Sequence, residues 1–243
     1  MLYLEKVFFE NYEQKNKYPF DIPVIKNTSE ISFTSPVTFL VGENGTGKST
    51  IIEAIAKAYG FNAEGGSTNF SFNTNGTTSS LSDYTRLKRS LYRPKDNYFL
   101  RAESFYNVIS NIDELDAIPA PTKKINASYG GKSLHLYSHG ESFFTLFNKR
   151  FKGDGLYILD EPEAALSIEK QYSLLYQIFT LVKRNSQFII ATHSPILLAY
   201  PDCKILSIED GELVEQKYEE TRQFQFMKMF INNYSYMLKK LFE

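Results

Sequence analysis

The stretch Gly42–Thr50, which reads GENGTGKST, decides the fold of this 243-residue chain. It fits the pattern G-x-x-x-x-G-K-[ST], a loop whose backbone N–H groups surround the phosphates of a nucleotide. The apolar run Val37–Val41 precedes the loop, and a helical pattern that stops at Gly60 follows it. A strand, a glycine-rich loop and a helix in this order predict an α/β fold with a nucleotide site at the loop.

The residue types in the loop suit this chemistry. Glycine allows backbone conformations and a close approach of the phosphates that a side chain would block. We expect Lys48 to reach the β- and γ-phosphates as a catalytic point charge and the Ser49 hydroxyl to ligate Mg²⁺. For Thr50, the last residue of the motif, a role in packing the helix is favoured over a role in the chemistry. The predicted nucleotide-binding residues of the loop are Gly42, Asn44, Gly45, Thr46, Gly47, Lys48, Ser49 and Thr50.

Two carboxylates follow a second apolar run, because Leu156–Leu159 ends in Asp160 and Glu161. Ligands of open α/β sheets bind at the carboxyl ends of the strands, so both carboxylates are expected beside the loop. Asp160 is then the carboxylate on the metal side. Glu161 is the candidate general base that orients and deprotonates the attacking water. The alternative is a polar strand end that caps the following helix.

A histidine ends the next predicted strand. Phe188–Thr192 is mostly apolar and is followed by His193, Ser194 and Pro195. At the end of a strand parallel to the previous one, His193 can contact the γ-phosphate or the attacking water, and it is therefore a candidate catalytic residue. The alternative is a histidine that is hydrogen-bonded in a turn before proline.

The segment Tyr137–Ser142, YSHGES, contains the start signal of a helix. Ser138 and Glu141 form a capping box that opens a helix predicted over Ser142–Phe151. A capped helix start with a free hydroxyl and a glycine N–H is also a site for anions. Ser138 and Gly140 are therefore candidate nucleotide-binding residues.

Together, the segments GENGTGKST, YSHGES, ILDEP, EAALS and ATHSP resemble the motifs of ABC-type ATPases. Within that group, the chain is most similar to small stand-alone bacterial ATPases labelled AAA-family and to the heads of chromosome-maintenance and recombination-repair ATPases. The resemblance spans nearly the whole chain. It implies a P-loop NTPase fold of the ABC-ATPase type, with a mixed central sheet, an N-terminal antiparallel sheet and a helical lobe that carries YSHGES.

The same resemblance implies a mechanism. ATP and Mg²⁺ are the expected cofactors, and Lys48, Glu161 and His193 are the expected catalytic residues. In the family, the segment matching Ser138 and Gly140 grips the γ-phosphate of ATP bound to a second subunit, which implies an ATP-dependent head-to-tail homodimer. The expected output is a signal to nucleic acid, or to a nuclease or toxin partner, in genome maintenance or phage defence. The nucleotide-binding subunit of a membrane transporter is one alternative, and a nucleotide-sensing scaffold without turnover is another.

Three positions depart from the family pattern. His139 replaces the first of two glycines in the signature segment, and Ser167 stands where an aspartate is usual. The predicted strand Tyr98–Ala102 runs into Glu103, where transporter-type members place a glutamine. Glu103 is therefore a candidate contact to the metal or to water, with a carboxylate at a helix start as the alternative.

We expect one domain over residues 1–243, with the helical lobe at approximately 81–151. The patterns of Leu2–Phe9 and Ile31–Phe33 predict the N-terminal antiparallel sheet. Two dipeptides of the type that favours tight turns, Asn75-Gly76 and Asp210-Gly211, each predict a hairpin.

Two further helices are expected. Ser167 is expected to cap a helix over Ile168–Arg184, whose predicted core face consists of Tyr172, Leu175, Phe179 and Val182. The chain closes with an amphipathic helix rich in Phe and Met. We expect this helix to pack on the body of the protein, with a surface for docking a partner as the alternative.

Composition narrows the class of protein. The formal charge is −1 and the hydrophobic content is 42%, as expected for a globular domain without a general affinity for nucleic acid. No apolar run approaches the roughly 18–20 residues of a membrane span. The single cysteine, Cys203, is expected to be a buried small residue, and one cysteine fits the reducing cytoplasm. The basic stretch Arg86–Lys95 either contacts nucleic acid or forms a salt-bridged surface.

Overall fold

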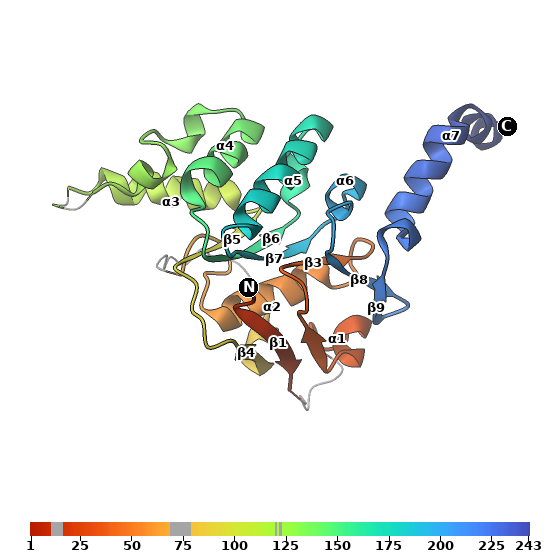
Figure 1. Cartoon of the computed structure of the whole chain (residues 1–243), viewed down its shortest axis with the longest axis horizontal. Helices are drawn as coiled ribbons and strands as arrows, with labels where there is room; N and C mark the ends of the chain where they lie inside the picture. Colours follow the sequence, from red (N-terminus) through yellow and green to blue (C-terminus); the bar gives the residue numbers. More distant parts are fainter. Residues whose placement is uncertain (11–16, 69–78, 120, 122) are drawn as a thin grey trace.

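The computed structural model describes residues 1–10, 17–68, 79–119, 121 and 123–243, and for His139 it describes the backbone alone. The hairpin predicted at Asn75-Gly76 lies outside the described residues. Figure 1 shows a central sheet with helices α3 to α6 on one face and helix α2 on the other.

The central sheet is mixed, as predicted. Its strand order is β5-β6-β7-β3-β8-β9, and every neighbouring pair is parallel except the last, which is antiparallel. All residues of β3, β6 and β7 are buried, because helices cover both faces of these strands. In the order of the sheet, the strands are β5 (Asp96–Arg101), β6 (Gly155–Asp160), β7 (Gln187–Ala191), β3 (Val37–Val41), β8 (Lys204–Glu209) and β9 (Glu212–Gln216).

The predicted hairpin at Asp210-Gly211 joins β8 to β9. Both of its residues have positive φ, 49° for Asp210 and 81° for Gly211. This geometry matches the right-handed twist of the two strands. The prediction of a turn at this dipeptide is confirmed.

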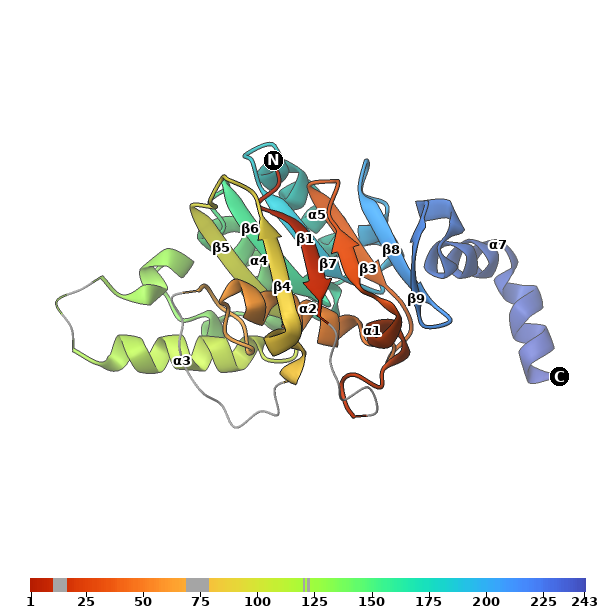
Figure 2. The same ribbon diagram turned by 90° about the horizontal axis from the view of Figure 1, so that it is seen from below.

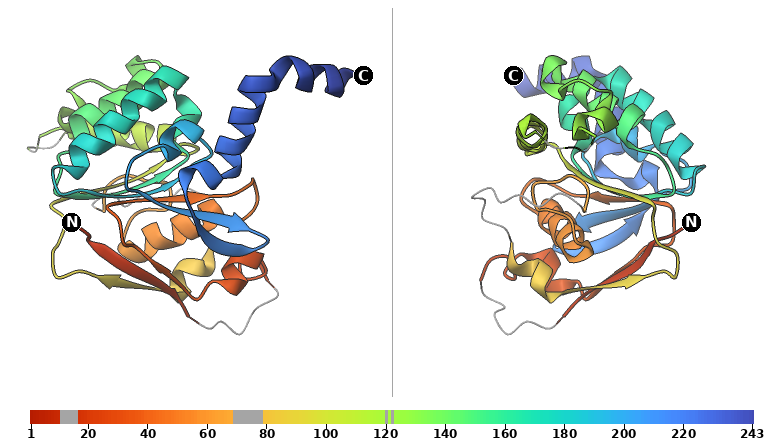
Figure 3. Two further views of the ribbon diagram at one scale, coloured as in Figure 1. Left: turned by 45° about the vertical axis from the view of Figure 1, so that its right-hand side comes forward. Right: turned by 90° about the vertical axis from the view of Figure 1, so that its left-hand side faces the viewer.

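A small antiparallel sheet lies below the central one and has the order β2-β1-β4. It consists of β1 (Leu4–Phe9), β2 (Glu30–Ser32) and β4 (Thr85–Arg89). Helix α2 (Lys48–Tyr59) packs between the two sheets, with α1 (Pro23–Asn27) beside it (Figure 3). The amide of Gln187 accepts hydrogen bonds from the Tyr3 and Leu4 amides and donates one to the Leu4 carbonyl, which fixes β1 to the start of β7.

The helical lobe is narrower than the predicted range of 81–151. Residues 85–89 form β4, because Thr85 and Leu87 pair with β1, and residues 96–101 form β5, because the apolar run 98–100 enters the central sheet. Helix α3 (Phe105–Ala117) extends beyond the sheet on one side (Figure 2). Helix α4 (His139–Thr145) begins directly after Ser138, three residues earlier than predicted, and continues as a π-helical turn over Leu146–Arg150.

The predicted core face of α5 (Ile168–Val182) is right for Leu175 and Val182, which pack against the core, and wrong for Tyr172 and Phe179. The side chains of Leu174, Ile178 and Leu181 face the core, whereas Tyr172 is 72% exposed and Phe179 is 40% exposed. Ser167 caps this helix by accepting a hydrogen bond from the Lys170 amide, as expected. The short helix α6 (Pro195–Leu198) follows β7. Within the described ranges, 3₁₀ turns cover Ser80–Tyr84, Ile125–Tyr129, Leu134–Leu136, Pro162–Ala165 and Tyr218–Glu220.

The C-terminal helix α7 (Arg222–Phe242) does not pack on the body, contrary to expectation. None of its described residues is buried, and Figure 1 shows it projecting away from the sheet. Asn233 interrupts its helical backbone. The amphipathic pattern produced a helix with exposed apolar side chains, including Phe226, Tyr234 and Leu241. Among the helices of the described ranges, none is both long and apolar enough to cross a membrane.

Candidate functional site

The phosphate-binding loop connects the carboxyl end of β3 to the first turn of α2. Gly45 and Gly47 have φ of 80° and 103°, a region that favours glycine. A Cβ on Gly47 would lie 3.0 Å from methyl groups of both Ile22 and Val24, so this glycine is also required by packing. The Thr46 hydroxyl donates to the Glu43 carbonyl within the loop. The sequence therefore forms the expected strand, loop and helix.

Lys48 lies beneath the loop and is only 4% exposed. Its ammonium group donates to the carbonyl oxygens of Gly42 and Glu43 at 2.9 and 2.8 Å. Burial lowers the pKa of Lys48, and the carboxylates of Glu161 and Asp160 oppose that shift. The lysine is thus held at the loop, with the negative charges of two carboxylates nearby.

Asp160 is the last residue of β6 and meets Ser49 at the start of α2. The Ser49 hydroxyl donates to Asp160 Oδ1 at 3.1 Å. Burial raises the pKa of Asp160 to about 6, although nearby Arg101 and the bond from Ser49 act in the opposite direction. A hydroxyl and a carboxylate held together are oxygen ligands of the kind that Mg²⁺ prefers.

Glu161 and His193 come from neighbouring parallel strands. His193 Nε2 lies 3.5 Å from Glu161 Oε1, and this nitrogen is buried without a hydrogen-bond partner among the described residues. The Glu161 amide donates to the Ala191 carbonyl, so the main chains of β6 and β7 remain paired up to the site. Glu161 itself has φ 53° and ψ 51°, a left-handed conformation that is strained for a residue with a side chain.

Two residues that contribute to this site were missed in the sequence. Glu163 Oε1 accepts a 2.6 Å hydrogen bond from the His193 amide, which fixes the backbone at the histidine. Burial raises the pKa of Glu163. Arg101, the last residue of β5, lies beside Asp160 in the parallel register. The third carboxylate in the sequence DEPE was a visible signal for Glu163, whereas Arg101 carried no motif.

Glu103 follows Arg101 and is 81% exposed. Its carboxylate pairs with Arg101 Nη2 at 3.2 Å, and Arg101 Nε is 3.8 Å from Asp160 Oδ2. Glu103 is thus linked to Asp160 through Arg101, which pairs with both carboxylates. The role of Glu103 toward a metal stays a prediction.

The signature segment has the predicted capping box but no free hydroxyl. The Glu141 carboxylate accepts from both the Ser138 amide at 2.9 Å and the Ser138 hydroxyl at 2.6 Å. A Cβ on Gly140 would lie 3.0 Å from the Ala165 carbonyl and 2.9 Å from Lys170 Nζ. Gly140 is thus required by packing within its own chain. Ser138 is exposed on the helical side of the sheet, and the first turn of α2 lies on the other side (Figure 1).

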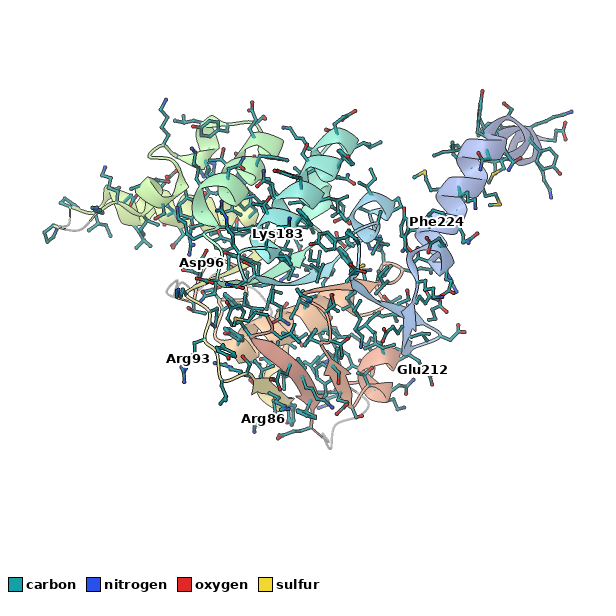
Figure 4. All side chains as sticks on the ribbon, in the orientation of Figure 1. Arg86, Arg93, Asp96, Lys183, Glu212 and Phe224 are labelled. Carbon is teal, nitrogen blue, oxygen red and sulfur yellow. The ribbon has the colours of Figure 1, made fainter. Side chains whose placement is uncertain are left out.

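The basic stretch forms a salt-bridged surface, the alternative left open above. Arg86, Lys88 and Lys95 each pair with a carboxylate at 2.9 Å. Arg89 lies over the Tyr59 ring, with its guanidinium carbon 4.3 Å from the centroid. Figure 4 shows Arg86 and Arg93 at the edge of the molecule.

The sequence model of a family described as AAA domain matches residues 19–225. No curated protein matches the chain.

Three examples illustrate the solved structures with a similar fold. One is CbiO1 from Clostridium perfringens, part of the ABC transporter complex CbiONQ, with a TM-score of 0.55 and 16% identity over 95% of this chain and 96% of that one. Another is an SMC head bound to the C-winged helix domain of ScpA, with a TM-score of 0.52 and 17% identity over 90% of this chain and 99% of that one. The third is MJ1267, an ATP-binding cassette of an ABC transporter in its ADP conformation, with a TM-score of 0.52 and 16% identity over 96% of each chain. The predicted fold, that of P-loop ATPase heads, is confirmed.

Proposed function

Since the chain belongs to the AAA domain family and is an ATPase, we propose that it hydrolyses Mg-ATP at the loop Gly42–Thr50, in a site that a second copy completes. One observation carries this proposal. The carboxyl ends of the parallel strands β3, β6 and β7 bring Ser49, Asp160, Glu161 and His193 to one edge of the central sheet. That edge is where ligands of open α/β sheets bind.

The loop and Lys48 bind the phosphates in this proposal. Backbone N–H groups at the start of α2 face the phosphates together with the positive end of the helix dipole. The Lys48 ammonium, held 2.9 Å from the Gly42 carbonyl, exchanges loop carbonyls for phosphate oxygens when ATP enters.

The residues present fit a magnesium ion. Ser49 and Asp160 would hold it together with phosphate oxygens and water, since Mg²⁺ is usually bound by one or two carboxylates plus substrate phosphates. Within the described ranges, no cluster of three or more His, Cys, Asp or Glu side chains forms a separate metal cage. The ion neutralises charge on the phosphate oxygens when it is bound.

Glu161 is the general base and His193 its neighbour. The Glu161 side chain is 41% exposed, so water reaches its carboxylate. The Nε2 of His193 is buried beside Glu161 and lacks a hydrogen-bond partner among the described residues, so it can contact the γ-phosphate or the attacking water once the ring turns toward the nucleotide. The bond from the His193 amide to Glu163 fixes the backbone at the histidine.

Ser138 and Gly140 of a second copy close the site. Because each copy supplies both a loop and a signature segment, two equivalent sites obey one two-fold axis and the interface is self-complementary. The exposed Ser138 at the start of α4 supports this role. The Ser138 hydroxyl must then turn from Glu141 toward the ATP of the partner.

The output of the cycle is a signal to nucleic acid or to a nuclease or toxin partner, which rests on the resemblance of the motifs. The single cysteine supports a cytoplasmic location. The fold is similar to transporter ATPases and to an SMC head at nearly equal TM-scores, so it does not separate these outputs. Co-purification with a membrane-spanning subunit would favour the transporter.

The variant Glu161→Gln tests the proposal. It keeps the shape of the side chain and removes the base, so turnover should fall by about 10²–10⁴-fold. ATP should still bind and draw two copies together, because nothing cleaves the nucleotide. Light scattering with and without Mg-ATP measures the mass. A Glu161→Gln protein that stays monomeric in ATP would overturn the dimeric site.

A further inference from the structure

The Arg101 guanidinium lies among three carboxylates at the edge of the candidate site. Its Nη1 is 3.2 Å from Glu53 Oε2, its Nη2 is 3.2 Å from Glu103 Oε2, and its Nε is 3.8 Å from Asp160 Oδ2. The side chain is 24% exposed. Arg101 is paired with Asp160 in the parallel register of β5 and β6, so the backbone itself places the cation there.

In the protein without ligands, Arg101 is the cation within ion-pair distance of Asp160 among the described residues, and Lys48 adds a smaller electrostatic effect. The Asp160 side chain is only 5% exposed, and a buried carboxylate is costly without a neighbouring positive charge. Ser49 donates to Oδ1, and Arg101 faces Oδ2. Arg101 Nε is nevertheless buried without a hydrogen-bond partner among the described residues. The ion pair is therefore loose, held by charge rather than by a hydrogen bond.

A divalent metal at Asp160 would meet this guanidinium. Two positive groups on one carboxylate repel each other, and the repulsion is strong where little water screens it. Glu53 and Glu103 offer Arg101 other partners. Glu53 is itself held in place, because its Oε1 accepts a hydrogen bond from the Ser79 amide. Glu103 lies in the turn before α3 and is exposed.

We propose that Arg101 is a positioning residue that holds Asp160 in the metal-free protein and competes with the divalent metal for it. Arg101 therefore weakens metal binding and sets how much metal the site needs. The proposal rests on the function proposed above in taking Asp160 as a metal ligand, and its test also relies on the proposed nucleotide site. The other role open to Arg101 is purely structural, as a link between β5 and Glu53 on α2. The two roles predict different changes in metal affinity when the arginine is removed: tighter binding if Arg101 competes with the metal, and equal or weaker binding if its role is structural.

The test measures Mn²⁺ binding by electron paramagnetic resonance in the full chain saturated with a non-hydrolysable ATP analogue. Arg101→Gln should bind Mn²⁺ about tenfold more tightly than the unmodified protein, because a like charge a few ångströms from the metal is removed. Arg101→Lys keeps the charge and should restore most of the weaker binding. Arg86→Gln is the matched control, since it removes an arginine from an ion pair with Glu10 on the small sheet. Its Mn²⁺ affinity should not change.

A second pair of variants does not depend on removing the semi-buried arginine alone. Glu103→Gln takes away an exposed partner of Arg101, so the guanidinium should stay on Asp160 and Mn²⁺ should bind more weakly. If Glu103 acts through Arg101, the same change made in Arg101→Gln should have no further effect. A further loss of Mn²⁺ affinity in the double variant would instead make Glu103 a metal ligand and would overturn this part of the proposal.

The outcomes separate this inference from the proposed function. If Asp160→Asn does not reduce Mn²⁺ binding, the metal site of the proposed function is wrong. If Asp160→Asn abolishes binding while a folded Arg101→Gln binds Mn²⁺ equally or more weakly, the competition is wrong and Arg101 is structural. Thermal melting of each variant establishes that it is folded.

Discussion

The Ser49 hydroxyl donates a 3.1 Å hydrogen bond to Asp160, which joins the first turn of α2 to the end of β6 across 111 positions of the chain. The two residues belong to different motifs, and each was assigned to the metal from its own surroundings. Their contact shows that the fold assembles both motifs into one site. The consequences of that arrangement can be tested residue by residue.

Lys48→Met should remove the ammonium and keep most of the buried hydrocarbon. ATP affinity should fall by about 100-fold, because a charge-assisted contact to the phosphates is lost. Isothermal titration measures the affinity, and thermal melting measures the fold. Lys57→Met is the control, since Lys57 lies on the same helix and donates to the Ser79 carbonyl instead. An unchanged affinity in Lys48→Met would contradict the assignment.

Ser138→Arg should block pairing of two copies and turnover while one copy still binds ATP. The larger, charged side chain stands where the nucleotide of the neighbour must fit. Ser128→Arg adds the same group to an exposed position of the same lobe and should turn over ATP normally. Turnover and mass in Mg-ATP are compared for both proteins. Normal hydrolysis by Ser138→Arg would make YSHGES a capped helix and nothing more.

The two loop glycines should differ in their effect on stability. Gly45→Ala places a Cβ where no described atom lies within 4 Å, so only the positive φ is strained, at about 1 kcal/mol. Gly47→Ala adds contacts at 3.0 Å with Ile22 and Val24 and should cost about 2–4 kcal/mol in the free energy of unfolding. Urea denaturation without nucleotide measures both values. Equal losses would show that Ile22 and Val24 move aside freely.

Cys203 should be a poor nucleophile. Burial raises the pKa of its thiol from 9.0 to about 11, because burial disfavours the thiolate. At pH 8 the thiolate fraction is then about 100-fold lower than that of a free cysteine. The rate of labelling with a disulfide reagent should keep rising about tenfold per pH unit up to pH 10, and in urea it should level off near pH 9. A native rate that levels near pH 9 would contradict the shift.

The strands and the loop could be predicted because their signals are local. The apolar runs before Gly42 and Asp160 and before His193 became β3, β6 and β7, and all three are buried. Arg101 could not be found in this way. A single arginine at the end of a strand can be assigned to the site only when the strand register is known to place it beside Asp160. Register depends on residues far apart in the chain.

One helix prediction failed in part and another in full, because periodicity shows which residues share a face of a helix but not what that face contacts. Helix α5 has two overlapping apolar stripes, and periodicity alone chose the one with Tyr172 and Phe179 over the one with Leu174 and Ile178. In α7, the amphipathic pattern established that one face is apolar but not that anything covers it.

At Glu161, the left-handed backbone favours glycine for stability, whereas the proposed function requires a carboxylate. A glycine there would relax the main chain, whereas the carboxylate requires a side chain that this conformation disfavours. If Glu161 is the general base, as proposed, the protein retains a destabilising residue for the sake of turnover. Selection for heat resistance alone, without selection for hydrolysis, would be expected to replace Glu161 with glycine and to yield a more robust but inert protein.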